Sequence, residues 1–85
     1  MSTKEKMYQE LENQNLHPGW VGSSIRIGQV LMVRFYPDGE TIELLRFFPR
    51  RGWKSMAITT DTYTISLVAK AQLQNINGFG RGMKA

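Results

Sequence analysis

Two runs rich in apolar side chains occupy the middle of this chain. These runs, 30–36 and 41–47, flank the tetrapeptide Pro37-Asp38-Gly39-Glu40. Asp-Gly between two such runs is a strong hairpin signal, because both residues tolerate the backbone angles of a tight turn. The pattern therefore predicts an antiparallel hairpin centred on Asp38 and Gly39.

The register of this hairpin can be chosen from the side chains that it brings together. A loop that leaves Tyr36 opposite Thr41 pairs Phe35 with Ile42, Val33 with Leu44, Met32 with Leu45 and Arg34 with Glu43. Opposite charges and apolar groups then meet across the strands, whereas a three-residue loop would put Arg34 against Ile42. We therefore predict the first register.

Helical spacing appears near the beginning of the chain. Ser2-Thr-Lys-Glu5 has the form of a capping box, and Met7 and Leu11 begin an apolar stripe on one helical face. His17-Pro18-Gly19 is typical of a helix end, since proline disfavours helical geometry in the residue before it. A helix over residues 3–15 is expected, followed by an alternating run at 25–27 that Gly28 interrupts, which indicates a bulge.

The last third of the chain supports two interpretations. Residues 56–60 are rich in β-branched side chains, and Tyr63, Ile65 and Leu67 alternate with polar residues, which predicts a strand to about residue 68 and then a helical turn to 75. A helix capped near Asp61 is the competing interpretation. Three glycines in residues 77–85 predict a flexible, basic tail.

These elements indicate an α+β fold. The expected architecture is an N-terminal helix packed on a four-stranded antiparallel β-meander, or a small half-open barrel. Residues 1–76 would form the single small domain, and 77–85 the flexible Gly-rich tail. Both faces of the central hairpin are fairly apolar, so one face should meet the helix and the other needs a second cover or a partner.

Composition excludes several kinds of functional site. The chain has no cysteine, which excludes disulfides and thiolate metal sites, and its one histidine lies in the helix-ending turn. No apolar run approaches the roughly 20 residues that span a bilayer, so a cytoplasmic protein without membrane contact is expected. No motif identifies a reaction, and neither catalytic residues, a metal nor a cofactor are predicted.

Charge is distributed unevenly along the chain. Residues 1–43 hold four basic and six acidic groups, whereas residues 44–85 hold seven basic groups and Asp61 as the one acid. Such asymmetry favours contact between the second half and an anionic partner.

The segment Arg46–Lys54 concentrates both cations and aromatic rings. This combination is typical of surfaces that hold phosphates and stack on bases, although rings in so small a domain also commonly anchor the core. Arg46 shares its parity with the core face of the hairpin, and Phe48 is interpreted as structural. The predicted contact residues for nucleic acid or a partner are Arg46, Phe47, Arg50, Arg51, Trp53, Lys54 and, in the tail, Arg81.

The leading hypothesis is a small non-enzymatic protein that binds DNA or RNA through backbone phosphate with low sequence specificity. The alternative is an accessory subunit or inhibitor that docks on a larger protein complex, with its basic residues against an acidic surface. A homo-oligomer formed through an exposed sheet edge is compatible with both.

Overall fold

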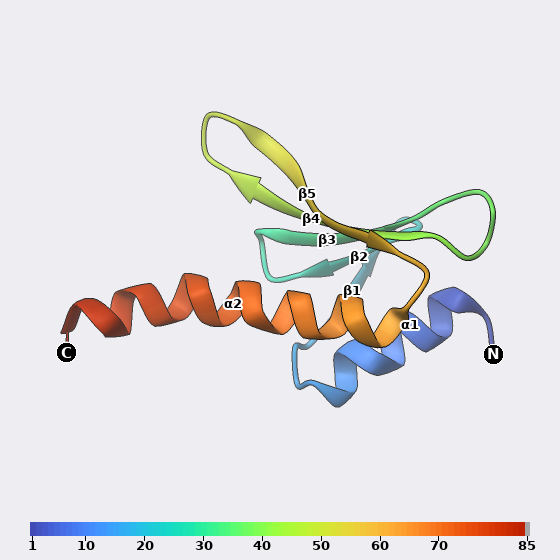
Figure 1. The fold of residues 1–85 in the computed structure, drawn as a ribbon, viewed down its shortest axis with the longest axis horizontal. Helices are drawn as coiled ribbons and strands as arrows, with labels where there is room; N and C mark the ends of the chain where they lie inside the picture. The colour runs from blue at the N-terminus through green and yellow to red at the C-terminus, as the bar shows by residue number, and fades with distance from the viewer. Residues whose placement is uncertain (85) are drawn as a thin grey trace.

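The computed structural model describes the backbone of residues 1–84 and the side chains of residues 1–76. Two helices and five strands follow one another along the chain (Figure 1). Their bounds are α1 (Thr3–Asn13), β1 (Gly19–Val21), β2 (Ser24–Ile27), β3 (Leu31–Phe35), β4 (Ile42–Phe48), β5 (Gly52–Thr59) and α2 (Thr62–Lys84).

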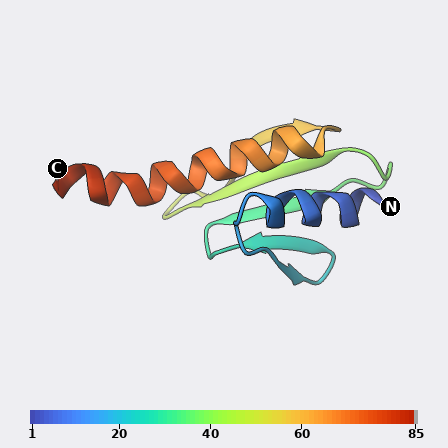
Figure 2. The same ribbon diagram turned by 90° about the horizontal axis from the view of Figure 1, so that it is seen from below.

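The strands form one antiparallel meander in the order β1-β2-β3-β4-β5. Both helices lie on the same face of this sheet, and α2 runs along β4 and β5 beside α1 (Figure 2). The α+β architecture is confirmed, with five strands where the sequence predicted four. No element was predicted between α1 and β2, and the short edge strand β1 forms there.

The core lies between the helices and the sheet. It consists of fully or almost fully buried side chains from both helices and from β2, β3 and β4: Met7, Leu11, Ile25, Ile27, Leu31, Val33, Ile42, Leu44, Ile65 and Ala69. Strand residues in this set occupy every second position, because successive side chains of a strand point to opposite faces. The positions between them therefore point away from the helices.

The predicted register of the central hairpin is confirmed. Arg34 pairs with Glu43 and Met32 with Leu45, as the side chains indicated. The turn closes with the Tyr36 N–H donating to the Thr41 carbonyl at 2.9 Å.

The N-terminal helix is confirmed together with its capping box. The Ser2 hydroxyl accepts from the Glu5 N–H at 3.1 Å, and the Glu5 carboxylate accepts from the Ser2 N–H at 2.9 Å. The helix ends at Asn13, slightly earlier than predicted, and Asn15 and His17 take the left-handed φ angles of 61° and 53° that turn the chain toward β1.

The strand predicted for residues 62–68 is wrong, and the competing helix forms there. Asp61 caps α2 by accepting from the Tyr63 N–H at 3.0 Å and from the Thr64 hydroxyl at 2.8 Å. Burial follows helical spacing, since Ile65 and Ala69 face the core. The helix continues to Lys84, into the segment for which the sequence predicts a flexible tail, and the mobility of that segment stays a prediction.

The predicted bulge at Gly28 is also misplaced. Gly28 has a φ of 62° and belongs to the turn between β2 and β3. The irregularity lies elsewhere, between β4 and β5, where Leu44 pairs with Ala57 and Leu45 with Ser55, which leaves Met56 as the extra residue.

Candidate functional site

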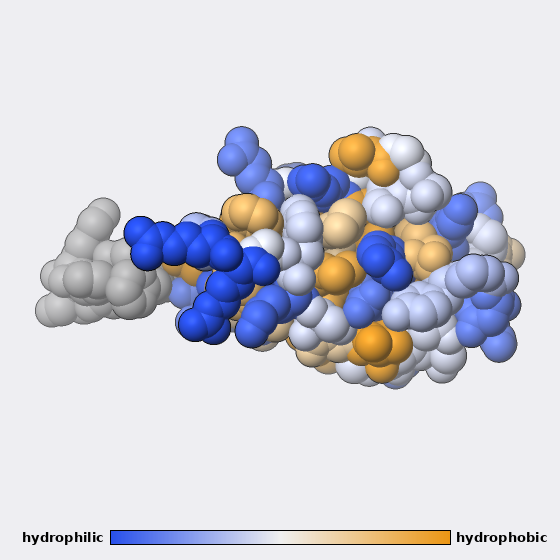
Figure 3. Space-filling model, turned by 90° about the horizontal axis from the view of Figure 1, so that it is seen from above, coloured by the Kyte–Doolittle hydropathy of each residue, from blue (hydrophilic) through white to orange (hydrophobic). Residues whose placement is uncertain are grey.

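One face of the sheet is left without a helix by the part of the chain that the structure describes (Figure 1). We call it the open face. Figure 3 looks onto this side of the molecule, where hydrophobic side chains lie between hydrophilic ones and the hydrophilic ones gather toward the end at which α2 extends. Register places on it Arg26, Met32, Arg34, Glu43, Leu45, Phe47, Trp53, Ser55 and Ile58.

Three of these side chains meet across the open face. The Arg26 guanidinium carbon lies 4.9 Å from the centroid of the Trp53 ring. Phe47 meets the same ring edge-on, with centroids 5.4 Å apart and an angle of 62° between the planes. Both geometries are favourable, because the face of an aromatic ring attracts cations and the electropositive edges of other rings. The contact between Arg26 and Trp53 is called the arginine–tryptophan bridge below.

The arginine–tryptophan bridge spans the middle of the sheet. Arg26 is on β2 and Trp53 on β5, so their side chains meet over β3 and β4. Leu45 lies on this side of β4 and is only 8% exposed, although no described helix covers it. Because register puts Arg26, Met32 and Leu45 in one row across the strands, we infer that the two long side chains of the bridge shield the apolar centre of the face.

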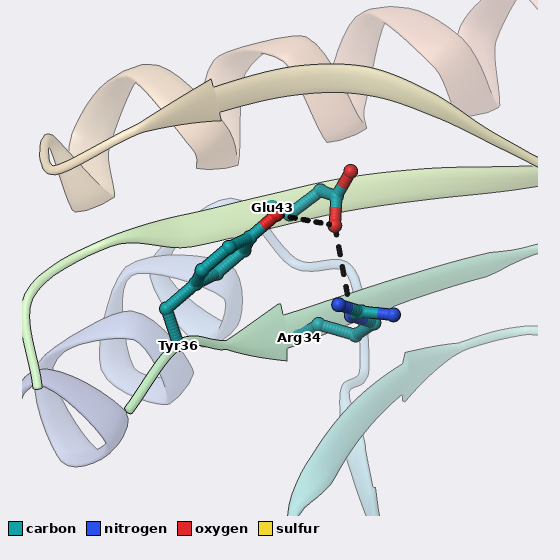
Figure 4. A network of polar contacts seen from close by, with 3 residues as sticks. All are labelled: Arg34, Tyr36 and Glu43. Atoms are coloured by element: carbon teal, nitrogen blue, oxygen red, sulfur yellow. Dashed lines mark hydrogen bonds and ion pairs between the residues drawn. The ribbon is translucent and has the colours of Figure 1, made fainter. Parts of the chain in front are cut away.

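A second polar contact occupies the same face (Figure 4). The Arg34 Nε lies 3.5 Å from the Glu43 Oε1, and the Tyr36 hydroxyl donates to the same oxygen at 3.3 Å. Glu43 is 7% exposed, whereas the Arg34 side chain is 51% exposed. A nearly buried carboxylate needs such partners. The arrangement shields the negative charge of Glu43 and leaves about half of the Arg34 side chain exposed.

The turn between β4 and β5 carries two more cations. Arg50 and Arg51 are exposed, at the tip of a hairpin that rises away from the helices in Figure 1. The Arg51 N–H donates to the Phe48 carbonyl at 3.1 Å, and Arg50 and Gly52 have left-handed φ angles of 74° and 79°. The turn is thus held by its backbone, and both arginines are exposed.

The structure divides the predicted contact residues between the two faces. Phe47 and Trp53 lie together on the open face, and neither belongs to the core between sheet and helices. Arg50 and Arg51 lie in the adjoining turn. Arg81 lies outside the residues whose side chains are described.

Arg46 and Lys54 pair with one another on the helix-facing side of the sheet. Arg46 donates to the Gln72 Oε1 of α2 at 2.7 Å, and its guanidinium lies 4.7 Å from the Phe48 centroid. Arg46 therefore connects the hairpin to α2 on the side of β4 that it shares with Leu44, and is not turned toward the open face. Lys54 is exposed on the same side, away from the Trp53 ring.

Two residues of the site were missed by sequence reasoning: Arg26 and Arg34. Arg26 alternates with the buried Ile25 and Ile27, which is the one local signal that it faces outward. Its contact with Trp53 joins residues far apart in the chain, so no local pattern predicts it. The pairing of Arg34 with Glu43 was predicted, but Arg34 was not among the predicted contact residues.

Acidic groups gather at the opposite end of β4. Asp38 and Glu40 lie in the turn that precedes β4, whereas the arginine pair lies in the turn that follows it. The Thr41 hydroxyl, followed by the backbone N–H groups of Thr41 and Glu40, lowers the pKa of Asp38 by hydrogen bonding to its carboxylate. Asp38 is thus ionised at neutral pH, and charge is polarised along the hairpins, with the positive end at the β4–β5 turn.

Other sites offer less chemistry in the described part of the chain. No three His, Cys, Asp or Glu side chains among the described residues gather as a metal site would require. A hollow at the end of α1 is lined by Glu12, Asn15, His17 and Pro18, and it holds no nucleophile beside the histidine. None of the helices in the described residues is both long enough and apolar enough to cross a bilayer. No protein-family model, curated protein or solved structure matches this chain.

Proposed function

We propose that this chain is a small, non-enzymatic nucleic-acid-binding protein. It contacts the phosphate backbone of DNA or RNA with the open face and the β4–β5 turn. The observation that carries the proposal is the cluster of Arg26, Trp53 and Phe47 on a sheet face that no described helix covers. Cations interleaved with aromatic rings on an accessible sheet are suited to a polyanion with flat bases.

Charge on this side of the molecule supports an anionic ligand. The open face and the β4–β5 turn present Arg26, Arg34, Arg50 and Arg51. Glu43, the one acid among the strand residues that register places on the open face, is paired and almost buried. Arginine suits phosphate because its planar fork of donors can bind two oxygens at once.

The same side chains favour low sequence specificity. Discrimination between bases needs hydrogen-bonding groups that match base edges, most often asparagine, glutamine or a constrained arginine. The residues that register places on the open face include no asparagine or glutamine. Arginines that contact phosphate fix the position of a strand and carry little information about its sequence.

A titration of a fluorescent oligonucleotide by anisotropy, repeated over a range of salt, tests this function. Each phosphate contact on a single strand contributes about −0.7 to the slope of log K against log salt, so four contacts give a slope of about −3. Arg50→Glu/Arg51→Glu removes two of them and should bring the slope to about −1.4, with a large loss of affinity at low salt.

The matched control is Lys6→Glu/Lys70→Glu, which changes the net charge equally on the exposed surfaces of the two helices. It should retain most of the affinity, because these residues lie on the covered side of the sheet. The proposal is wrong if wild-type affinity is no better than millimolar at low salt, or if the turn variant and the helix control bind alike.

A second candidate function, docking on a larger protein, has its own supporting observation. Tyr63 and Leu67 lie one turn apart on α2 and are 52% and 42% exposed. Adjacent exposed apolar side chains are a common feature of protein interfaces. A partner that co-purifies with the wild type but not with Leu67→Glu would favour docking, and a strictly monomeric chain without a partner would contradict it.

A further inference from the structure

The Trp53 ring already carries a planar, positively charged group on one of its faces. The Arg26 guanidinium lies 4.9 Å from its centroid, while Phe47 approaches with an angle of 62° between the ring planes. Trp53 is only half-buried, and the arginine reaches it from a strand that is not its neighbour in the sheet. The cation therefore occupies a stacking position that the sheet itself does not fill.

We propose that the nucleic acid is single-stranded and that one of its bases stacks on Trp53 in the place that Arg26 occupies in the free protein. This inference rests on the proposed function. A base and a guanidinium are both flat, so one can replace the other on the ring. Arg26, once displaced, remains beside the base and is free to bind a phosphate of the same strand.

The geometry of the open face explains why the strand must be single. In a duplex each base is stacked on its neighbours and only its edges are accessible in the grooves. The open face offers the flat side of Trp53, and no helix of the described residues lies on this face to enter a major groove. Unpaired bases expose the surface that such a ring can contact.

Replacement of the Arg26 guanidinium by a base on Trp53 also agrees with the interaction energies of the two contacts. An exposed cation–π contact is weak, and a base stacked on an aromatic residue generally contributes more. The bridge thus shields the apolar centre of the open face, including Leu45, until a ligand takes over that cover. The free protein avoids an exposed apolar surface without losing access to the ring.

A fluorescence experiment can follow Trp53 alone. The chain has two tryptophans, and in Trp20→Phe the remaining one is Trp53. Trp20 stacks on Tyr8 with centroids 5.4 Å apart, so phenylalanine retains an aromatic contact there. Three probes of equal length should be titrated: oligothymidine, an abasic phosphodiester strand and a blunt duplex.

Oligothymidine should quench Trp53 and bind about 5- to 150-fold more tightly than the abasic strand, which is the range expected for one base–aromatic stack. The duplex should bind no better than the abasic strand. In Trp53→Leu the difference between oligothymidine and the abasic strand should vanish, while the salt dependence persists. Circular dichroism confirms that each variant is folded.

Arg26→Gln tests the exchange itself. This variant should change the fluorescence of Trp53 in the free protein, weaken binding of both strands, and retain the preference for bases. Loss of that preference in Arg26→Gln would show that the arginine stays on the ring, and would overturn the exchange. Equal binding of base-bearing and abasic strands, or tighter binding of the duplex, would overturn the single-strand inference while the proposed function stands. Binding of no probe would overturn the function as well.

Discussion

The arginine–tryptophan bridge makes a quantitative prediction for stability. Trp53→Ala removes an edge-to-face ring contact worth about 0.5–1.5 kcal/mol and a cation–π contact worth about 0.5–1 kcal/mol, and the lost burial of the ring adds to both, so a loss of at least about 1–2.5 kcal/mol is expected. Arg26→Ala removes the cation–π contact and should cost about 0.5–1 kcal/mol. The double variant should lose less than the sum by about 0.5–1 kcal/mol, because the two single changes remove one shared interaction.

Urea denaturation of the four proteins, followed by circular dichroism, measures this coupling. Trp53→Phe is the control, since it keeps a ring in contact with Phe47 and should lie between wild type and Trp53→Ala. Strict additivity, within the usual scatter of about 0.3–0.5 kcal/mol, would refute the reasoning. The bridge would then be absent in solution, and other side chains would have to account for the low exposure of Leu45.

Three further predictions concern the scaffold. Leu44→Ala in the core should destabilise by about 2–5 kcal/mol in urea, whereas Leu67→Ala, at a side chain 42% exposed, should stay within about 0.5 kcal/mol; similar losses would contradict the assigned core. The Cβ added by Gly52→Ala would meet no atom within 4 Å, but the residue must keep a φ of 79°. The variant should therefore lose about 1–2 kcal/mol of stability, whereas Gly19→Ala should lose almost none. Hydrogen bonds, of which the one from the Thr64 hydroxyl has the largest effect, lower the pKa of Asp61 from 3.8. The ionised carboxylate therefore stabilises the folded state above that pH, and this stabilisation is lost as pH falls through the lower pKa of the folded state. Melting temperatures of Asp61→Asn should depend less on pH below about 4 than those of the wild type, and parallel curves would refute this.

Local patterns predicted the parts of the fold that local interactions determine. The central hairpin was recovered because Asp38 and Gly39 define the turn and only one register pairs Arg34 with Glu43. The capping box was recovered because it is contained within four consecutive residues.

Residues 62–68 show where such patterns fail. Tyr63, Ile65 and Leu67 alternate like a strand, yet only Ile65 is buried, because burial against the sheet selects the helical set that includes Ile65 and Ala69. The cap at Asp61 then starts the helix despite the β-branched residues that follow. Burial against the sheet, which cannot be read from a local pattern, selected the helical period over the strand period in this segment.

The candidate site was predictable only in part, for a similar reason. The rings of Phe47 and Trp53 and the exposed turn arginines lie within one stretch of sequence, so composition alone identified them. The partner of Trp53 is Arg26, which only the order of the strands brings within reach. Conversely, Arg46 was grouped with the other cationic residues of segment 46–54, but the alternation of side chains along β4 places it on the helix-facing side, where it donates to Gln72.

The edges of the sheet support the proposal that a ligand binds the open face. Exposed edges invite strand addition unless they are short, charged or irregular. Here β1 has only three residues, and β5 carries the exposed Lys54 and the irregularity at Met56. These features disfavour a homo-oligomer formed through a sheet edge, which the sequence alone did not exclude. A ligand that binds side chains of a sheet face, and needs no backbone hydrogen bonds from its edge, is compatible with them, and a nucleic-acid strand is such a ligand.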